Sequence, residues 1–322
     1  MAKIKEIKSR IKSVSNTKKV TRAMEMVAAA KMRKAIERVL STRTYANSSW
    51  EIILNLANSI NINSTPHPLL TKRKKMSKIG IILITSNRGL CGGFNTTLIN
   101  KVVHSIKKHQ EVGVEKIETD FILLGKKGVS VYHNYGYNII ADFSKLDITP
   151  EFKEVFPISK MIIDGFLSEK YDKIMVAYTD FVNAVKQIPR IKQLLPIDIN
   201  SNEEYLGVVG QDTRVGLNKK FIEEKEEKHL SSNKFKYEYI FEPSSEEVLD
   251  EIIPRLIEIQ LYQALLESNA SEHSARMATM HKATDSAEEM VQELTLFYNK
   301  ARQGSITAEI AEISAGAEAL NK

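Results

Sequence analysis

The feature that most constrains this chain is its last quarter, from about Glu246 to Leu320, which has no proline after Pro254 and no glycine before Gly304. Apolar residues recur along it at alternating intervals of three and four, the a/d seam of a coiled coil rather than the broader apolar face of a globular helix. They are Met277, Met280, Ala287, Val291, Leu294, Tyr298 and Ala301, then Ile306, Ile310, Ile313, Ala317 and Leu320. A continuous helix over this span is about 110 Å long. No globular domain buries such a rod along its whole length, so we expect a partner helix.

The other end of the chain offers that partner. Residues 3 to about 57 contain no proline or glycine, and their apolar stripe predicts one long helix. The stripe opens at the same spacing and then shifts its phase, as a coiled coil does where its winding changes locally. Its members are Ile4, Ile7, Ile11 and Val14, then Thr17, Val20, Met24 and Val27, then Ala28, Met32, Ala35 and Val39.

The charges of the two ends are opposite. The first 38 residues hold twelve lysines and arginines against three glutamates, whereas the last quarter is rich in acids such as Glu288, Glu293 and Glu309. Each run alone is typical of a solvated helix face. Together with the matched seams, they favour two helices that pair with each other. The pairing is antiparallel if the residues between them form a compact domain.

The middle of the chain, residues 76–243, has the alternation typical of an α/β domain with a largely parallel, Rossmann-like sheet. Buried strands are predicted at Ile79–Thr85, Asp120–Leu124 and Lys173–Tyr178, with a fourth at Ile191–Ile197 and a last one at Lys236–Phe241. Helices are predicted at Phe94–Lys108 and Glu151–Leu167. A polar stretch at about 200–234 indicates a surface insertion. The domain boundaries are therefore 1–60, 76–243 and 245–322, with a linker of Asn61, Asn63, Pro66 and Pro68 before the domain.

A glycine-rich turn, Ser86-Asn87-Arg88-Gly89-Leu90-Cys91-Gly92-Gly93, follows the first predicted strand. Such a turn can cradle a phosphate at a helix N-terminus, but the spacing matches neither the dinucleotide fingerprint nor a P-loop. A structural role is favoured, with glycines allowing a tight turn and Asn95 or Thr96 capping the next helix. Cys91 has no base nearby in sequence, which favours a buried packing thiol over a nucleophile.

No other pattern indicates catalysis or a bound group. The seven histidines form no metal-ligand grouping, and His273 and His281 are too far apart on one helix to ligate together. We expect no catalytic residue, no cofactor and no metal site. The apolar runs are too short to span a bilayer, the single cysteine indicates a reducing compartment, and the basic N-terminus lacks the features of a secretory signal.

Two stretches resemble one family closely. Val20–Arg33 reads VTRAMEMVAAAKMR, and Tyr298–Ala319 reads YNKARQGSITAEIAEISAGAEA, with the signature Ile306-Thr307, Glu309, Glu312 and Gly316-Ala317. Both are similar to the gamma subunit of the rotary (F-type) ATP synthase, as is the turn SNRGLCGGFN. The resemblance covers nearly the whole chain. The insertion at 200–234 departs from it, since chloroplast forms carry a redox insert in this region that needs a cysteine pair absent here.

The resemblance implies a central rotor shaft that carries no catalytic site. The terminal helices would form an antiparallel coiled coil inside a ring of alpha and beta subunits, whose beta subunits hold the active sites. The α/β domain would bind the epsilon subunit and rest on the c-ring. The expected location is peripheral, without direct membrane insertion, on the cytoplasmic face of a bacterial inner membrane, with an organellar membrane as the less favoured setting.

The resemblance also implies partner-binding residues. Arg302, Gln303, Thr307 and Glu309 would meet the catch loops of the ring, and Met24 and Arg276 would lie near acidic loops of the beta subunits. Met24 could equally be a seam residue. Two other functions stay open: a nucleotide-binding α/β enzyme with helical dimerisation arms, and a basic N-terminal arm for nucleic acid or a membrane surface. The latter is weakened because few aromatic residues interleave with the lysines.

Overall fold

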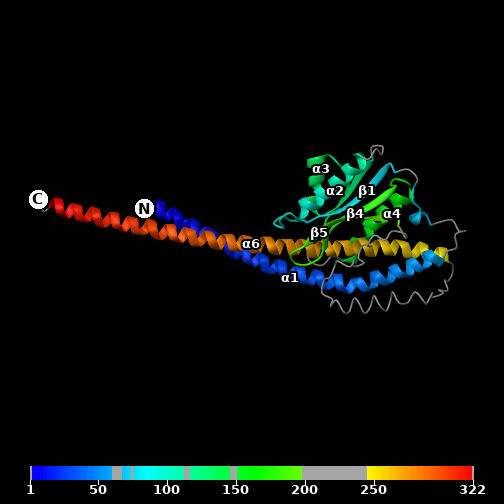
Figure 1. The fold of residues 1–322 in the computed structure, drawn as a ribbon, viewed down its shortest axis with the longest axis horizontal. Coiled ribbons are helices and arrows are strands. Elements are labelled where there is room, and N and C mark those ends of the chain that lie inside the picture. Colours follow the sequence, from blue (N-terminus) through cyan, green and yellow to red (C-terminus); the bar gives the residue numbers. More distant parts are fainter. Residues whose placement is uncertain are drawn as a thin grey trace. The chain divides into compact units, whose positions relative to one another are not determined.

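The structure is a computed structural model that describes residues 2–59, 67–73, 76–111, 117–145, 151–197 and 245–320. Two long helices, α1 (Ala2–Ser59) and α6 (Ser245–Leu320), lie before and after a sheet domain in the sequence (Figure 1). The chain divides into two compact units, one of residues 30–275 and one of residues 1–29 and 276–322. Both long helices contribute to both units.

The larger unit is built on a five-stranded sheet of order β3-β2-β1-β4-β5. Its strands are β1 (Lys78–Ile84), β2 (Glu118–Leu124), β3 (Asn138–Phe143), β4 (Lys173–Phe181) and β5 (Gln187–Leu195). The first four are parallel and β5 is antiparallel to β4. This confirms the predicted Rossmann-like, largely parallel sheet.

The differences from the predicted strands are at the two edges of the sheet. Strand β3 was not predicted, because it is a short edge strand that is only partly buried and shows no continuous apolar run. Strand β5 begins at Gln187 rather than Ile191 and includes Pro189, which an edge strand tolerates because one side of its backbone has no strand to bond. The strand predicted at Lys236–Phe241 and the insertion at 200–234 lie outside the described residues, as does most of the linker before the domain.

Helices cover both faces of the sheet. On one face, α2 (Phe94–Glu111) and the short α3 (Ser130–Tyr135) pack on a core that includes Ile81, Leu83, Leu98, Val102, Phe121 and Val131. On the other face lie α4 (Phe156–Leu167) and the first part of α6. The helix predicted at Glu151–Leu167 is thus divided into a 3-10 turn, Phe152–Glu154, and α4, whose first turn contains Pro157. Two further 3-10 turns are Pro68–Leu70 and Lys126–Val129.

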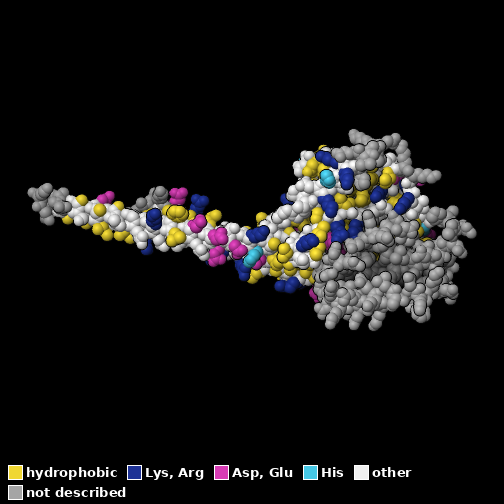
Figure 2. Space-filling model, in the orientation of Figure 1, with side chains coloured by type: hydrophobic (Ala, Val, Ile, Leu, Met, Phe, Trp, Pro, Cys, Tyr) yellow, Lys and Arg dark blue, Asp and Glu magenta, His cyan; other side chains and the backbone are white. Residues whose placement is uncertain are grey.

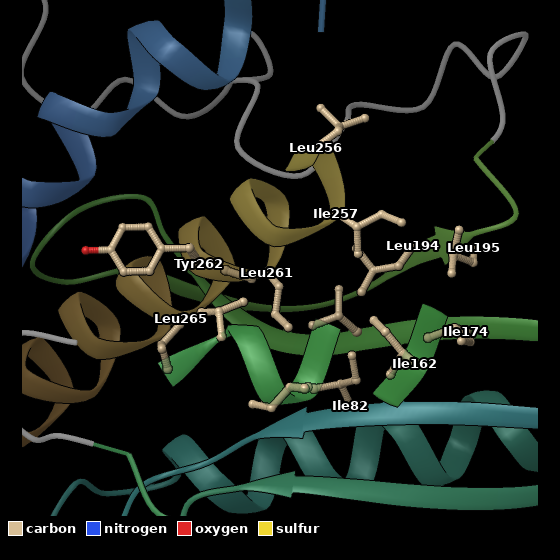
Figure 3. Close-up of a cluster of buried hydrophobic side chains, with 14 of the residues drawn as sticks. Ile82, Ile162, Ile174, Leu194, Leu195, Leu256, Ile257, Leu261, Tyr262 and Leu265 are labelled. Carbon is tan, nitrogen blue, oxygen red and sulfur yellow. The ribbon is translucent and has the colours of Figure 1, made fainter. Parts of the chain in front are cut away.

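The first part of α6 belongs to the core of the larger unit. Figure 3 shows Ile257, Leu261 and Leu265 of this helix directed at side chains from the sheet and α4, among them Ile82, Ile162, Ile174 and Leu194. Every residue from Leu256 to Ser274 is buried. A helix is buried on all sides only when neighbours surround it, so this stretch is a core element rather than one strand of a two-helix coil.

The side chain of Asp172 connects the starts of β1 and β4 by hydrogen bonds. Its carboxylate accepts hydrogen bonds from the Ser77 and Lys78 backbone N–H groups and from the Ser77 hydroxyl, at 2.8 to 2.9 Å. Burial acts to raise the pKa of Asp172, but these hydrogen bonds and the nearby charge of Arg73 together lower it below its ordinary value. The start of β1 is therefore tied to the start of β4 by an ionised side chain.

In the smaller unit, α1 and α6 form an antiparallel pair. Three side-chain contacts cross between them: Lys18 Nζ to Glu288 Oε1 at 2.8 Å, Thr21 Oγ1 to Thr284 Oγ1 at 2.8 Å, and Glu25 Oε1 to His281 Nδ1 at 3.2 Å. As the residue number rises on α1 it falls on α6, in step, which fixes both direction and register. The predicted antiparallel two-helix coiled coil is confirmed over these residues.

The buried and half-buried positions at the contact of this pair keep a single heptad phase. On α6 they are Met277, Met280, Thr284, Ala287, Val291, Leu294, Tyr298 and Ala301, and on α1 they are Ile4, Ile7, Ile11, Val14, Lys18, Thr21, Glu25 and Ala28. The phase shift predicted through Thr17, Val20, Met24 and Val27 is wrong: Val20 and Val27 are 58% and 56% exposed. The seam instead continues through polar residues, because α6 presents Glu288, Thr284 and His281 to pair with them.

The hydrogen bonds of the Asp172 carboxylate predict that the stability of the fold decreases in acid. Because its folded pKa is below its ordinary value of 3.8, the ionised carboxylate stabilises the fold above that pH, and the contribution is lost as the pH falls through the folded pKa. We expect Asp172→Asn to be less stable than wild type above about pH 5, with the difference shrinking in more acidic solution. Urea unfolding at a series of pH values measures it. Asp164→Asn, the same change on the exposed face of α4, is the control; a gap for Asp172→Asn that does not vary with pH would contradict the assignment.

The threonine pair predicts non-additive effects on stability. Thr284→Val removes one hydroxyl from a buried pair of hydroxyls, and we expect a loss of about 1 kcal/mol in the free energy of unfolding. Thr21→Val with Thr284→Val replaces both by apolar groups of the same shape, which is nearly neutral in general. A double-mutant cycle from chemical unfolding of the whole chain measures the coupling. Simple additivity of the two single changes would show that the hydroxyls do not interact.

Candidate functional site

One candidate surface lies on the outside of the paired helices. The stripe predicted for the seam, Val20, Met24 and Val27, exists on α1, with the two valines exposed and Met24 beside the seam, and we call it the outer stripe. Val20 and Val27 are more than half exposed and Met24 is half-buried. Here the coiled coil has polar residues inside and apolar residues outside. Exposed apolar side chains grouped on one helix face are typical of a surface that contacts another protein.

A second candidate surface is the end of α6. Counting residue by residue from the Lys18–Glu288 pair places Ala2, the first residue of α1, opposite about Gly304, while α6 continues to Leu320. Residues 306–317 are all exposed, and Ile306, Ile310 and Ile313 are 47%, 62% and 73% exposed. We call residues 302–320, of which those after Gly304 extend beyond the start of α1, the free segment. Figure 2 shows hydrophobic side chains running along it in yellow.

The free segment corrects one part of the predicted pairing. The apolar seam was expected to have a partner helix over its whole length, and this holds for Met277 to Ala301. It does not hold for Ile306, Ile310, Ile313 and Ala317, because the register leaves no described residue of α1 opposite them. The spacing of the stripe is the same on both sides of Gly304, so sequence alone could not show where the partner ends.

Four of the six predicted partner-binding residues are together on the free segment. Arg302, Gln303, Thr307 and Glu309 are all exposed there. The Thr307 hydroxyl donates to the Gln303 carbonyl at 2.9 Å, and the Ser305 hydroxyl donates to Glu309 Oε1 at 3.4 Å. These bonds are local to the helix and leave the outward faces of the side chains accessible.

The other two predicted residues, Met24 and Arg276, lie on the paired part of the helices. Both are half-buried. Met24 belongs to the outer stripe, and the seam positions next to it are taken by Thr21 and Glu25. The half-burial of Met24 beside these seam positions leaves both interpretations, a partner contact and a seam residue, as predictions.

The glycine-rich turn after β1 is closed on itself. Asn95 Oδ1 accepts the Ser86 backbone N–H at 2.9 Å, and Asn95 Nδ2 donates to Ser86 Oγ at 2.7 Å. The Ser86 hydroxyl in turn donates to the Arg88 carbonyl at 2.8 Å. The prediction that Asn95 or Thr96 caps α2 is wrong, because the helix begins at Phe94 and the Asn95 amide bonds back to the turn. Cys91 is 2% exposed beside Ser86 and Asn95, which confirms a buried packing thiol.

At the carboxyl edge of the sheet, where folds of this type bind ligands, α6 contacts residues near the ends of β3 and β4. The Ser271 hydroxyl donates to the Thr179 carbonyl of β4 at 3.0 Å. Lys145, two residues after β3, donates from Nζ to Glu272 Oε2 at 2.7 Å and to Asn269 Oδ1 at 2.8 Å. The side chains of Lys145 and Glu272 are 0% and 3% exposed. This arrangement favours the structural interpretation of the turn over the nucleotide-binding one.

The buried lysine is anchored to the turn as well as to the helix. Its carbonyl accepts a hydrogen bond from Asn87 Nδ2 at 2.6 Å, so the loop after β3 and the turn after β1 are joined at the same residue. Removing one partner from a buried ion pair of this kind costs about 3 to 5 kcal/mol in general, because the remaining charge has no water around it. Lys145 and Glu272 thus depend on each other.

No metal centre or membrane span is found in the part of the chain that the structure describes. No group of three or more His, Cys, Asp or Glu side chains there could hold an ion. Nor does any described helix combine the length and the apolar character that crossing a bilayer requires. His67 and His281 instead contact carboxylates, of Asp250 at 2.7 Å and of Glu25 at 3.2 Å. His273 is 2% exposed.

Sequence reasoning missed two sets of residues. Thr284 could have been found, because it occupies the vacant place between Met280 and Ala287 in the series of three and four. Including Thr284 in the seam would have placed Thr21 opposite Thr284 and Glu25 opposite His281. Lys145 and Glu272 gave no signal, since they are 127 residues apart and neither stands in a motif.

The comparisons with known proteins agree with one another. The sequence model described as ATP synthase matches residues 3–320. A curated relative, the ATP synthase gamma chain of Legionella pneumophila (strain Corby), is 38% identical over 320 residues, which are 99% of this chain and 100% of that one. The matches therefore extend over both long helices and the domain between them.

Solved structures share the fold. A chain in the rotor of the Euglena gracilis mitochondrial ATP synthase is similar with a TM-score of 0.58 and 16% identity, over 95% of this chain and 99% of that chain. A chain in the OSCP, F1 and c-ring assembly of the same enzyme has a TM-score of 0.63 and 18% identity, over 99% and 95% of the two chains. With the family match and the 38% identity over full length, these findings show that the chain belongs to the gamma chains of ATP synthase.

Proposed function

We propose that this chain is the rotating central shaft of an ATP synthase and makes no bonds itself. The observation that carries the proposal is the free segment of α6, a single helix with an exposed apolar stripe and no partner from α1. Such a helix needs an enclosing surface, because large exposed apolar side chains along one face are unfavourable in water. A ring of alpha and beta subunits with an apolar inner surface provides it.

The parts of the chain take separate roles in this proposal. Residues 1–60 and 245–322 supply the paired helices and the free segment, and residues 76–243 form a foot that binds the epsilon subunit and the c-ring. The name of the Euglena assembly, which includes a c-ring, supports this assignment by likeness of fold. The first part of α6, buried in the larger unit, belongs to foot and shaft at once.

In the proposed mechanism, the free segment makes different contacts with three chemically identical sites on the beta subunits. Helical periodicity puts Gln303 and Thr307 on one side of the stripe of isoleucines and Glu309 on the other, so the free segment presents a different chemistry in each direction. Each of three identical beta subunits then meets a different face, and its affinity for nucleotide is biased accordingly. Rotation permutes the three affinities, which couples proton flow to ATP synthesis or hydrolysis.

The paired part of the helices supplies a second zone of contact. Met24, on the outer stripe, and the cation Arg276 on α6 are proposed to meet acidic loops of the beta subunits. Both side chains are half-buried, so each offers part of its surface to a partner while resting on its own helix pair.

The proposed location follows from these partners. The chain is peripheral, held through the c-ring and the epsilon subunit on the cytoplasmic face of the inner membrane of a bacterium. The bacterial source of the curated relative supports this over an organellar membrane.

Co-purification tests the function as a whole. We expect the tagged chain, expressed with alpha and beta subunits of a bacterial ATP synthase, to purify in a complex that hydrolyses ATP, because its free segment completes the ring. ATP-driven rotation of a rod attached to the α/β domain is the direct measurement. The alternative outcome, a chain that purifies alone and binds nucleotide tightly, would support an enzyme instead.

The free segment predicts a local effect on coupling. Arg302→Glu together with Gln303→Leu reverses a charge and removes an amide on the exposed helix, and we expect impaired assembly or impaired ATP synthesis in membranes. Loss of a charge-assisted contact between proteins commonly costs 2 kcal/mol or more, about a thirtyfold change in an equilibrium. The circular dichroism of the isolated chain should not change, because both side chains are exposed.

The matched control is Lys107→Glu, a charge reversal on the exposed face of α2 in the larger unit. It should leave ATP synthesis at the wild-type rate. Normal synthesis by the Arg302→Glu, Gln303→Leu variant would count against a role for these two residues.

A further inference from the structure

We infer that the buried ion pair between Lys145 and Glu272 transmits torque between the α/β domain and α6. The inference rests on the proposed shaft function and names positioning residues within it. If the domain is the foot that turns with the c-ring, some contact must prevent the domain and the helix from turning independently. The contacts along α6 differ in how well they can do this.

Apolar packing holds α6 on the sheet but resists its rotation weakly. The core formed by residues such as Ile257, Leu261 and Leu265 against Ile82 and Ile162 is stabilised by removal of apolar surface from water. That force itself has no direction, and the shapes of the packed side chains supply the only resistance to rotation that this core offers. Contacts with a defined geometry add a directional resistance to it.

Lys145 provides such a contact. Its ammonium group makes two hydrogen bonds with successive turns of the helix, to Asn269 Oδ1 at 2.8 Å and to Glu272 Oε2 at 2.7 Å. Hydrogen bonds with ionised partners are the strongest that side chains make, and burial strengthens them further. Any rotation of α6 relative to the domain lengthens both bonds and separates two charges in the absence of water.

The lysine is itself fixed to the sheet. Asn87, in the turn after β1, donates to the Lys145 carbonyl at 2.6 Å, and β1 is the central strand of the five. Gly125, which follows β2, donates from its N–H to the Phe143 carbonyl at the end of β3, two residues before Lys145. The backbone that bears the ammonium group is therefore held by three neighbouring strands.

Weaker polar contacts extend the same line along α6. The Ser271 hydroxyl donates to the Thr179 carbonyl at 3.0 Å, and the Ser274 hydroxyl donates to the Ala184 carbonyl at 2.8 Å. Ser271, Glu272 and Ser274 lie immediately before Arg276, the residue at which α6 passes from the larger to the smaller unit. The polar contacts are thus at the last part of α6 that the domain encloses, where torque enters the paired helices.

Stability alone does not account for the pair. Burying two charges costs free energy of desolvation, and well-packed apolar residues of similar volume are in general as stable or more stable. What an ion pair adds is a single preferred orientation of the groups that bear it. That property is what a joint under torsion requires.

The test uses the complete ATP synthase with this chain, in inverted membrane vesicles. For Lys145→Met we expect ATP hydrolysis to continue while proton pumping per ATP hydrolysed falls about fivefold, the lower end of the coupling changes typical of linked sites. Lys145→Arg, which keeps the charge and the donors, should restore most of the ratio. Lys78→Met is the control, because it also breaks ion pairs of the domain, with Asp120 and Glu118, away from α6; its ratio should equal that of wild type.

A second measurement separates transmission from folding. With the ring immobilised, a rod attached to an exposed Lys107→Cys site should show wider angular fluctuation in the Lys145→Met complex than in wild type. If Lys145→Met changed neither the number of protons pumped per ATP hydrolysed nor the angular fluctuation of the rod, the inference would be overturned. So would failure of Lys145→Met and Glu272→Gln to assemble while Lys78→Met assembles, since the pair would then be needed for folding. If the wild-type complex neither rotates the chain nor pumps protons, the proposed function itself fails.

Discussion

One unbroken helix has to satisfy three different surroundings. From Leu256 to Ser274, α6 is enclosed on all sides, from Met277 to Ala301 it shares a narrow seam with α1, and beyond that its side chains are exposed. Each change of surroundings is met by a change in side-chain pattern and not by a break in the backbone. The enclosed part mixes apolar residues with buried polar groups such as Asn269 and Glu272, the paired part has a heptad seam, and the last part keeps an apolar stripe. The continuity of the helix is what connects the sheet domain to the free segment.

The paired part shows how register can be fixed at the expense of apolar contact. An apolar seam tolerates sliding by a heptad, because one apolar residue replaces another. Lys18, Thr21 and Glu25 lack that freedom, since each needs its own partner among Glu288, Thr284 and His281. Because these polar residues occupy the seam, Val20 and Val27 lie on the outside of the pair. Specificity inside the pair and an apolar contact surface outside it therefore have one cause.

Much of the fold could be predicted from the sequence, and the failures have physical reasons. Uninterrupted runs such as Ile79–Thr85 identified the central strands, because strands buried on both faces must be apolar throughout. Strand β3 was missed since an edge strand has no such requirement. The predicted phase of the α1 seam was wrong because hydrophobicity was the only criterion, whereas pairing with α6 leaves Thr21 buried and Glu25 half-buried. The proposed partner contacts of Arg302, Gln303, Thr307 and Glu309 came from resemblance to a family, because the spacing of exposed polar residues does not distinguish a contact surface from an ordinary helix surface.

The carboxyl edge of the sheet illustrates how a fold and its usual function can separate. In Rossmann-like domains the edge beyond β1 and β4 is open and binds a ligand. Here Ser86 and Asn95 close the turn, and Lys145 reaches α6 across the edge. The backbone arrangement that elsewhere positions a phosphate here positions an ammonium group, and the carboxylate that receives it belongs to the same chain. An ion pair with a helix of its own chain, buried at this edge, can hold that helix in one orientation.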